Sequence, residues 1–207
     1  MLSLFIFLLN LAASTTDHTA SQSSIELVNR FLPKGATVET LREFDPKTKS
    51  EKKALAAKIG RMSRKGGTYL AFIYTITNSK DGQRLRLRIV GNLGGRPAIL
   101  DQDLPGGFLW MQDFKTNGFQ VADLNGDGVD DILTITSEGA SLGGYLNIFA
   151  IDSGKLKSIL NKPHGYEVDG YRFQLEPGTD NIYRITVFSK DGLSALTLRW
   201  NGRLFIR

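Results

Sequence analysis

The sequence predicts an all-β fold of antiparallel meander repeats, arranged like a β-propeller with few or incomplete blades. Three observations support this. Apolar and polar residues alternate with a period of two in several stretches. Turn-forming pairs separate these stretches, and the chain holds 22 glycines among its 207 residues. A strand-and-turn pattern also recurs at a spacing of roughly 50 residues. The same signals allow a β-sandwich as the alternative architecture.

The first residues predict export. Leu2 to Leu11 is almost wholly apolar and is followed by the small residues Ala12, Ala13 and Ser14. An apolar core before a small-residue cleavage site is typical of a secretory signal, and the run is too short to span a bilayer. We therefore expect a signal peptide at 1–14, a flexible polar leader at 15–24, and a secreted, periplasmic or cell-surface protein. A buried N-terminal strand or helix is the alternative.

A single domain is expected over residues 25–207, and its first part is basic. Residues 30–65 hold eleven Lys and Arg against four Asp and Glu, although the whole chain carries only +5. Such a run is usually a solvated surface, and its alternative role is weak contact with an anionic surface. A nucleic-acid partner is not expected.

Three stretches alternate as half-buried strands do. Leucine and isoleucine alternate with arginine over 84–89, and similar alternation covers 183–187 and 196–200. The pair Asn201-Gly202 predicts a two-residue hairpin after the last of them.

Residues 50–62 allow two interpretations. Their composition and the spacing of Leu55, Ile59 and Met62 favour a helix. An alignment of three repeats, at 56–100, 121–161 and 172–206, instead makes the segment strand and loop.

The sequence "FQVADLNGDGVDDILTI" concentrates four carboxylates in one glycine-rich turn. Two carboxylates ~5 Å apart at an effective dielectric of ~20 repel by about 3 kcal/mol, so a cation is expected. With Asp123 as position one, oxygen ligands fall at positions one, three, five and nine, and a backbone carbonyl at seven. The predicted Ca²⁺ ligands are Asp123, Asn125, Asp127, Val129 and Asp131. The alternative is an Asx turn with solvated acids.

The loop is not an EF-hand, because Thr134 stands at position twelve and the flanks are strand-like. "GFQVADLNGDGVDDILTI", within residues 118–136, closely resembles the FG-GAP/VCBS repeat of integrin α-subunit propellers and many secreted bacterial proteins. Gly118 and Phe119 match its opening element. The resemblance implies a propeller-like fold and calcium ligands at Asp123, Asn125, Asp127 and Asp131. The closing Gly-Ala-Pro element is absent, so the VCBS variety is the closer match.

Signals for catalysis are few. The chain has no Cys and only two His, His18 and His164, which excludes thiolate chemistry and leaves no triad. The G-x-S-x-G motif at 139–143 precedes a predicted strand, so we interpret it as a turn. A carbohydrate-active enzyme is the alternative function, since Asp101, Asp103 and Asp113 lie near Trp110. Phe108 and Trp110 are otherwise expected to be core or blade-packing residues.

The sequence thus predicts an exported, non-catalytic calcium-binding β-repeat module that binds a protein or glycan at the cell exterior. Its alternatives are the carbohydrate-active enzyme and a structural protein that docks on an anionic surface through residues 30–65.

Overall fold

The computed structural model describes residues 22–45, 50–78, 82–92, 97–109, 118–138, 143–169, 172–189 and 191–207. With 60% strand and 7% helix, the fold is all-β, as predicted. The strand ladders are antiparallel, and no sheet in the described ranges closes on itself. The predicted signal peptide (1–14) lies outside the described residues, as does most of the predicted leader.

Three four-stranded antiparallel meanders form the body of the protein, and they coincide with the three predicted repeats. The first contains β4 (Ala57–Gly60), β5 (Tyr69–Asn78), β6 (Gly82–Gly91) and β7 (Ala98–Asp103). The second contains β9 (Phe119–Ala122), β10 (Asp131–Ser137), β11 (Gly143–Asp152) and β12 (Lys155–Ser158). The third contains β14 (Arg172–Pro177), β15 (Tyr183–Phe188), β16 (Ser194–Trp200) and β17 (Phe205–Ile206).

Short strands extend the first two sheets. The long strands β5, β10 and β11 each pair with two short partners, one along each half of their length. The extra partners are β1 (Ala36–Val38) on β5, β8 (Phe108–Leu109) on β10 and β13 (Tyr166–Asp169) on β11. A separate hairpin joins β2 (Thr40–Asp45) to β3 (Ser50–Leu55), and a short 3₁₀ turn covers Thr179–Asn181.

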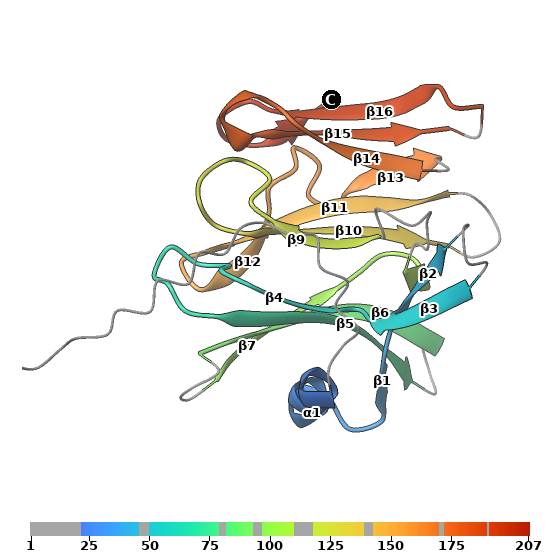
Figure 1. The fold of residues 1–207 in the computed structure, drawn as a ribbon, viewed down its shortest axis with the longest axis vertical. Coiled ribbons are helices and arrows are strands. Elements are labelled where there is room, and N and C mark those ends of the chain that lie inside the picture. Colours follow the sequence, from blue (N-terminus) through green and yellow to red (C-terminus); the bar gives the residue numbers. More distant parts are fainter. Residues whose placement is uncertain are drawn as a thin grey trace, which may run out of the picture.

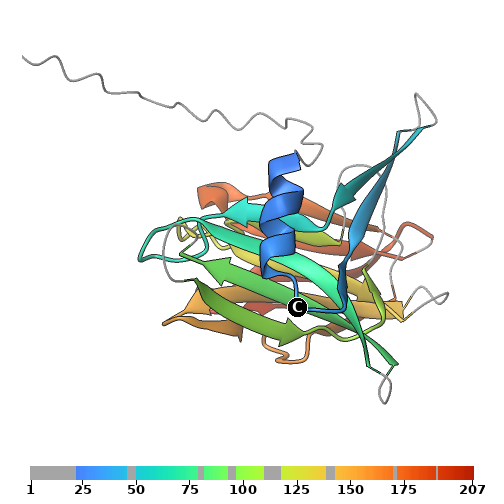
Figure 2. The ribbon, with the colours of Figure 1, turned by 90° about the horizontal axis from the view of Figure 1, so that it is seen from below.

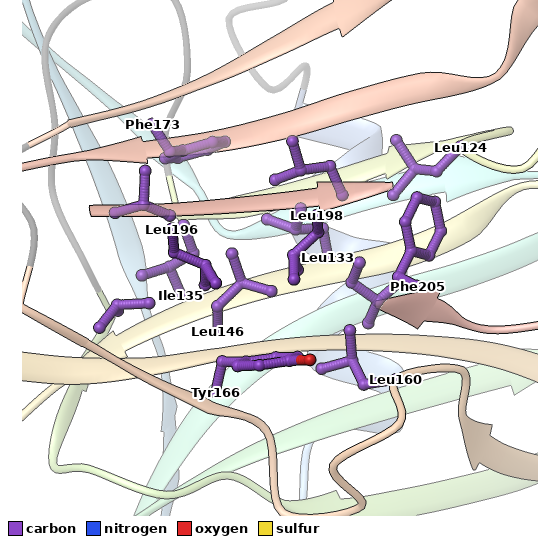
Figure 3. Packing of buried hydrophobic residues seen from close by; sticks show 14 residues of the cluster. Leu124, Leu133, Ile135, Leu146, Leu160, Tyr166, Phe173, Leu196, Leu198 and Phe205 are labelled. Atoms are coloured by element: carbon purple, nitrogen blue, oxygen red, sulfur yellow. The ribbon is translucent and has the colours of Figure 1, made fainter. Parts of the chain in front are cut away.

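The three sheets stack face to face, with the second sheet in the middle (Figure 1). One apolar layer joins the first and second sheets and includes Ile73, Leu87 and Ile132. Another joins the second and third sheets, where Leu133 and Leu198 meet (Figure 3). Because β10 is buried on both faces, its residues do not alternate between buried and exposed, as is usual for a strand covered on two sides.

Helix α1 (Gln22–Phe31) covers the other face of the first sheet (Figure 2). Val28 and Phe31 pack against Phe72 and Tyr74 of β5. The helix begins at Gln22, so its first three residues fall within the segment 15–24 that was predicted as a flexible leader. No helix was predicted there. Its apolar stripe on the face toward the sheet was the available signal.

The helix predicted for residues 50–62 is wrong, because this segment forms β3 and β4. Residues 57–60 pair in register with 69–72 of β5, and those inter-strand hydrogen bonds outweigh a weak local preference for helix. Ile59 is 55% exposed while Met62 is fully buried, so the residues of the helical pattern do not share one face.

The alternating segments at 84–89, 183–187 and 196–200 lie in β6, β15 and β16, as predicted. The two-residue hairpin at Asn201-Gly202 is wrong in length. Trp200 pairs with Phe205, so the loop has four residues, and the Asn201 Oδ1 accepts hydrogen bonds from the amides of Arg203 and Leu204. Side-chain bonding of Asn201 thus replaces the tight turn.

Candidate metal-binding loop

The acidic loop, residues 123–130, joins β9 to β10 at one end of the middle sheet. Ala122 pairs with Asp131 at its base, so the loop connects two antiparallel neighbours, as the sequence predicts. Gly126 and Gly128 adopt φ angles of 77° and 80°. This left-handed backbone suits glycine and allows the chain to reverse twice within a few residues.

Inside the loop, side-chain oxygens accept hydrogen bonds from backbone amides. The Asp123 Oδ1 accepts from Gly126 at 2.8 Å, and its Oδ2 accepts from Gly128 at 2.8 Å. The Asn125 Oδ1 and the Asp127 Oδ1 each accept from the amide two residues later, both at 3.0 Å. These hydrogen bonds are typical of Asx turns. The Asx turn of the alternative interpretation is therefore present in the structure.

The acids of the loop are nevertheless not all solvated. Asp131 is only 2% exposed, and Asn125 is also buried. The Asp131 Oδ2 accepts one hydrogen bond from the Leu124 amide at 3.2 Å. Burial is the main cause that raises the pKa of Asp131 to about 8; the Leu124 bond opposes the rise, and the charges of Asp127 and Asp123 add to it. The loop therefore holds a buried acid beside two further carboxylates.

The corresponding loop of the first repeat, residues 61–68, packs against the acidic loop. The Arg61 amide donates to the Asp130 Oδ2 at 2.7 Å, and the Asp130 amide donates to the Arg61 carbonyl at 2.9 Å. The Arg64 Nη2 lies 2.9 Å from the Asp127 Oδ2. Because the Arg64 side chain is 78% exposed, this ion pair is well screened and stabilises the fold only slightly.

The third repeat contacts the acidic loop from the other side. The Tyr183 amide donates to the Leu124 carbonyl at 2.9 Å. A Cβ added to Gly126 would lie 2.7 Å from the Asp180 carbonyl oxygen, so only glycine fits there without movement. The acidic loop is thus held between the first and third repeats, and its conformation is linked to both.

The predicted ligands Asp123, Asn125, Asp127 and Val129 lie in this loop, and Asp131 directly follows it as the first residue of β10. Within the described part of the chain, no three His, Cys, Asp or Glu side chains are arranged to hold a metal ion. The side-chain oxygens bond to the loop's own amides instead. The donors are carboxylate, amide and carbonyl oxygens, a set that fits calcium. Calcium binding stays a prediction.

Two of the acids considered for catalysis, Asp101 and Asp103, form ion pairs with arginines of the first sheet. Asp101 on β7 forms an ion pair with Arg88, with the Asp101 Oδ2 2.6 Å from the Arg88 Nη2, and Asp103 pairs with Arg86 at 2.6 Å. Asp113 and Trp110 lie outside the described residues. Phe108 is 54% exposed, so its predicted core position is wrong; the short strand β8 turns it outward.

Residues 139–142 of the G-x-S-x-G motif lie outside the described residues, between β10 and β11. Gly143 opens β11, which pairs along its length with β10, so a strand follows the motif where a nucleophile elbow needs a helix. His164 lies in an exposed turn, and His18 lies outside the described residues.

No protein-family model, curated protein or solved structure matches the chain. None of the helices in the described ranges is both long and apolar enough to cross a membrane.

Proposed function

We propose that the protein is an exported, non-catalytic calcium-binding module whose residues 118–136 form an FG-GAP/VCBS-type repeat. The three stacked sheets are the blades of an incomplete propeller in this proposal. The fold class, the strand–loop–strand setting of the acidic loop and the oxygen chemistry of its residues support it.

The buried carboxylate of Asp131, with Asp123 and Asp127 close by, carries the proposal. Within the described residues, only the exposed Arg64 forms an ion pair with any of these three acids. A calcium ion at the loop would supply the positive charge that a buried, self-repelling acid lacks. The side chains of Asp123, Asn125, Asp127 and Asp131 and the Val129 carbonyl would hold it.

Calcium bound there would also stiffen the contacts between the repeats. The acidic loop bonds to Arg61 of the first repeat and to Tyr183 of the third. An ion that fixes the loop would therefore fix both neighbours, and the surface they form is the candidate binding face for a protein or a glycan. The role is one of binding, with no catalytic group assigned.

A calcium titration with a thermal readout tests the proposal. At about 2 mM calcium and a Kd of about 0.1 mM, linkage predicts about 1.8 kcal/mol of stabilisation. For a domain of this size that is a rise of roughly 4–7 °C in Tm. The variant Asp127→Ala should lose the rise. Asp130→Ala, in the same loop but outside the ligand set, should keep it. A Tm that no calcium concentration moves would contradict the proposal.

A further inference from the structure

The outward face of the third sheet is hollowed into a groove. A cavity of about 600 Å³ lies over β15 and β16, and a second of about 370 Å³ adjoins it. The two share Glu176, Arg184 and Arg199, so they form one continuous depression. A space of this size is within the range of small-molecule sites.

The charge of the groove is positive. Its larger cavity is lined by Arg184, Arg199 and Arg207 against the single acid Glu176. The register that pairs Ile185 with Leu198 places Arg184 opposite Arg199 on neighbouring strands. Like charges in such cross-strand positions repel, and an anion between them would remove the repulsion.

One of the two arginines is already paired and the other is not. The Arg184 Nε donates to the Glu176 Oε2 at 2.6 Å. The side chain of Arg199 makes no ion pair or hydrogen bond within the described ranges, although it lines both cavities. A guanidinium offers two parallel donors to a carboxylate, so Arg199 is suited to a carboxylate ligand.

Hydroxyl groups and aromatic rings complete the groove. Thr186, Ser194 and Thr197 line its centre, and the Ser194 Oγ lies 3.0 Å from the Thr197 Oγ1. Phe188 lines the larger cavity, and the Arg172 guanidinium lies 4.8 Å from its ring centroid. Trp200 lines the adjoining cavity but packs against Phe205 and the core. Hydroxyl groups that both donate and accept hydrogen bonds suit the hydroxyl groups of a sugar.

We propose that this groove binds an acidic oligosaccharide, with sugar carboxylates on Arg199 and Arg184. A second copy of the chain is a poor occupant, because two such faces would bring arginine against arginine. A protein partner would need an apolar centre for its contact, and the centre here is hydroxyl and guanidinium. The inference rests on the proposed binding role but not on the calcium site.

Isothermal titration calorimetry of the full chain with an oligogalacturonate hexamer tests the proposal. Uronates bind calcium themselves, so the titration is run in EDTA. We expect saturable binding that the neutral maltohexaose does not reproduce. Arg199→Gln should weaken binding at least tenfold. Arg203→Gln makes the same change of charge in the neighbouring exposed loop, outside the groove, and should leave the affinity unchanged.

Three results would overturn the proposal: no binding of the hexamer, equal loss in both variants, or binding to anionic phospholipid vesicles or polyglutamate but not to the hexamer. The calcium titration is a separate measurement of the same protein. A lost hexamer signal with an intact calcium shift therefore rejects the groove alone, and the opposite pattern rejects the calcium loop alone.

Discussion

The side chain of Arg88, on β6, contacts helix α1 and the strands β5 and β7. Its Nε lies 2.7 Å from the Asp101 Oδ1, its Nη1 donates to the Phe31 carbonyl at the end of α1 at 2.7 Å, and its guanidinium lies 5.4 Å from the Tyr74 ring centroid. A cation at the C-terminus of a helix is favourable because the last carbonyls are unsatisfied there. Arg88 thus fastens the helix to the sheet that it covers.

This arrangement predicts an acid-sensitive contribution to stability. Burial opposes the change, but the hydrogen bonds and charge of Arg88 lower the pKa of Asp101 below its usual 3.8. The folded protein therefore binds fewer protons than the unfolded chain near that pH. The contribution is fully present above about pH 4 and is lost as the pH falls through the folded pKa.

Asp101→Asn should accordingly flatten the loss of stability between about pH 5 and pH 2. Urea unfolding of both proteins across this range measures it. The exposed Asp169 is a control, and Asp169→Asn should leave the slope as it is in the unchanged protein. An identical slope for all three proteins would show that the Arg88–Asp101 pair contributes nothing.

At the scale of elements, α1 acts as a cover for the first sheet. Leu70, Phe72 and Tyr74 point from β5 toward the helix, while Ala71 and Ile73 point toward the second sheet. The alternation of β5 therefore supplies two apolar faces, and both need a partner. Without the helix, one of them would meet water.

Substitutions in α1 test this role. Val28→Asp places a carboxylate at a fully buried position among apolar side chains and should cost about 3–5 kcal/mol, because burial penalises the charged form. Ile25→Asp makes the same kind of change at a position that is 42% exposed and should cost less than about 1 kcal/mol. Chemical denaturation measures both. Equal losses would mean that the helix does not pack as described.

At the scale of the whole molecule, the two ends of the stack differ. The first sheet is covered by a helix, whereas the outward face of the third sheet is polar and carries the arginine groove. A polar outer face is what a terminal repeat needs in an array of stacked units. The third repeat therefore ends the stack and also covers the apolar layer of the middle sheet.

Removing the third repeat should expose that layer. In a chain that ends at Asp169, Leu133, Ile135 and Leu146 of the middle sheet would lose their partners. We expect this chain to aggregate or to bind a hydrophobic dye strongly, whereas the full chain should do neither. Size-exclusion chromatography with dye fluorescence checks this. A soluble, dye-free monomer would show that the layers are independent.

Much of the fold could be predicted from local pattern. The alternation at 84–89 is confirmed in β6, because arginine and leucine at period two suit one wet and one dry face. The Ser153-Gly154 pair, one of the turn-forming pairs of the sequence, joins β11 to β12 with left-handed φ angles of 51° and 76°. The helical pattern at 50–62 failed because the pairing partner lies in β5, beyond the reach of any local window.

The candidate site could likewise be predicted from the sequence only in part. The spacing of acids and glycines in residues 123–131 indicated a bend between strands, and the structure has that bend. Nothing in the spacing indicated that Asp131 is buried or that Asp127 meets Arg64. Burial depends on how the sheets pack, and Arg64 lies 63 residues earlier in the chain than Asp127. The arginine groove was missed because Arg184 and Arg199 meet only across a strand pair.

The sequence by itself determined the alternating strands at 84–89, 183–187 and 196–200 and the acidic bend, because period, glycine and side-chain hydrogen bonding act within a few residues. Only the tertiary structure decided which faces stack, which acid is buried and which arginines share a groove. Burial and charge pairing depend on distances between atoms, and the residues concerned are brought together only when the three sheets pack.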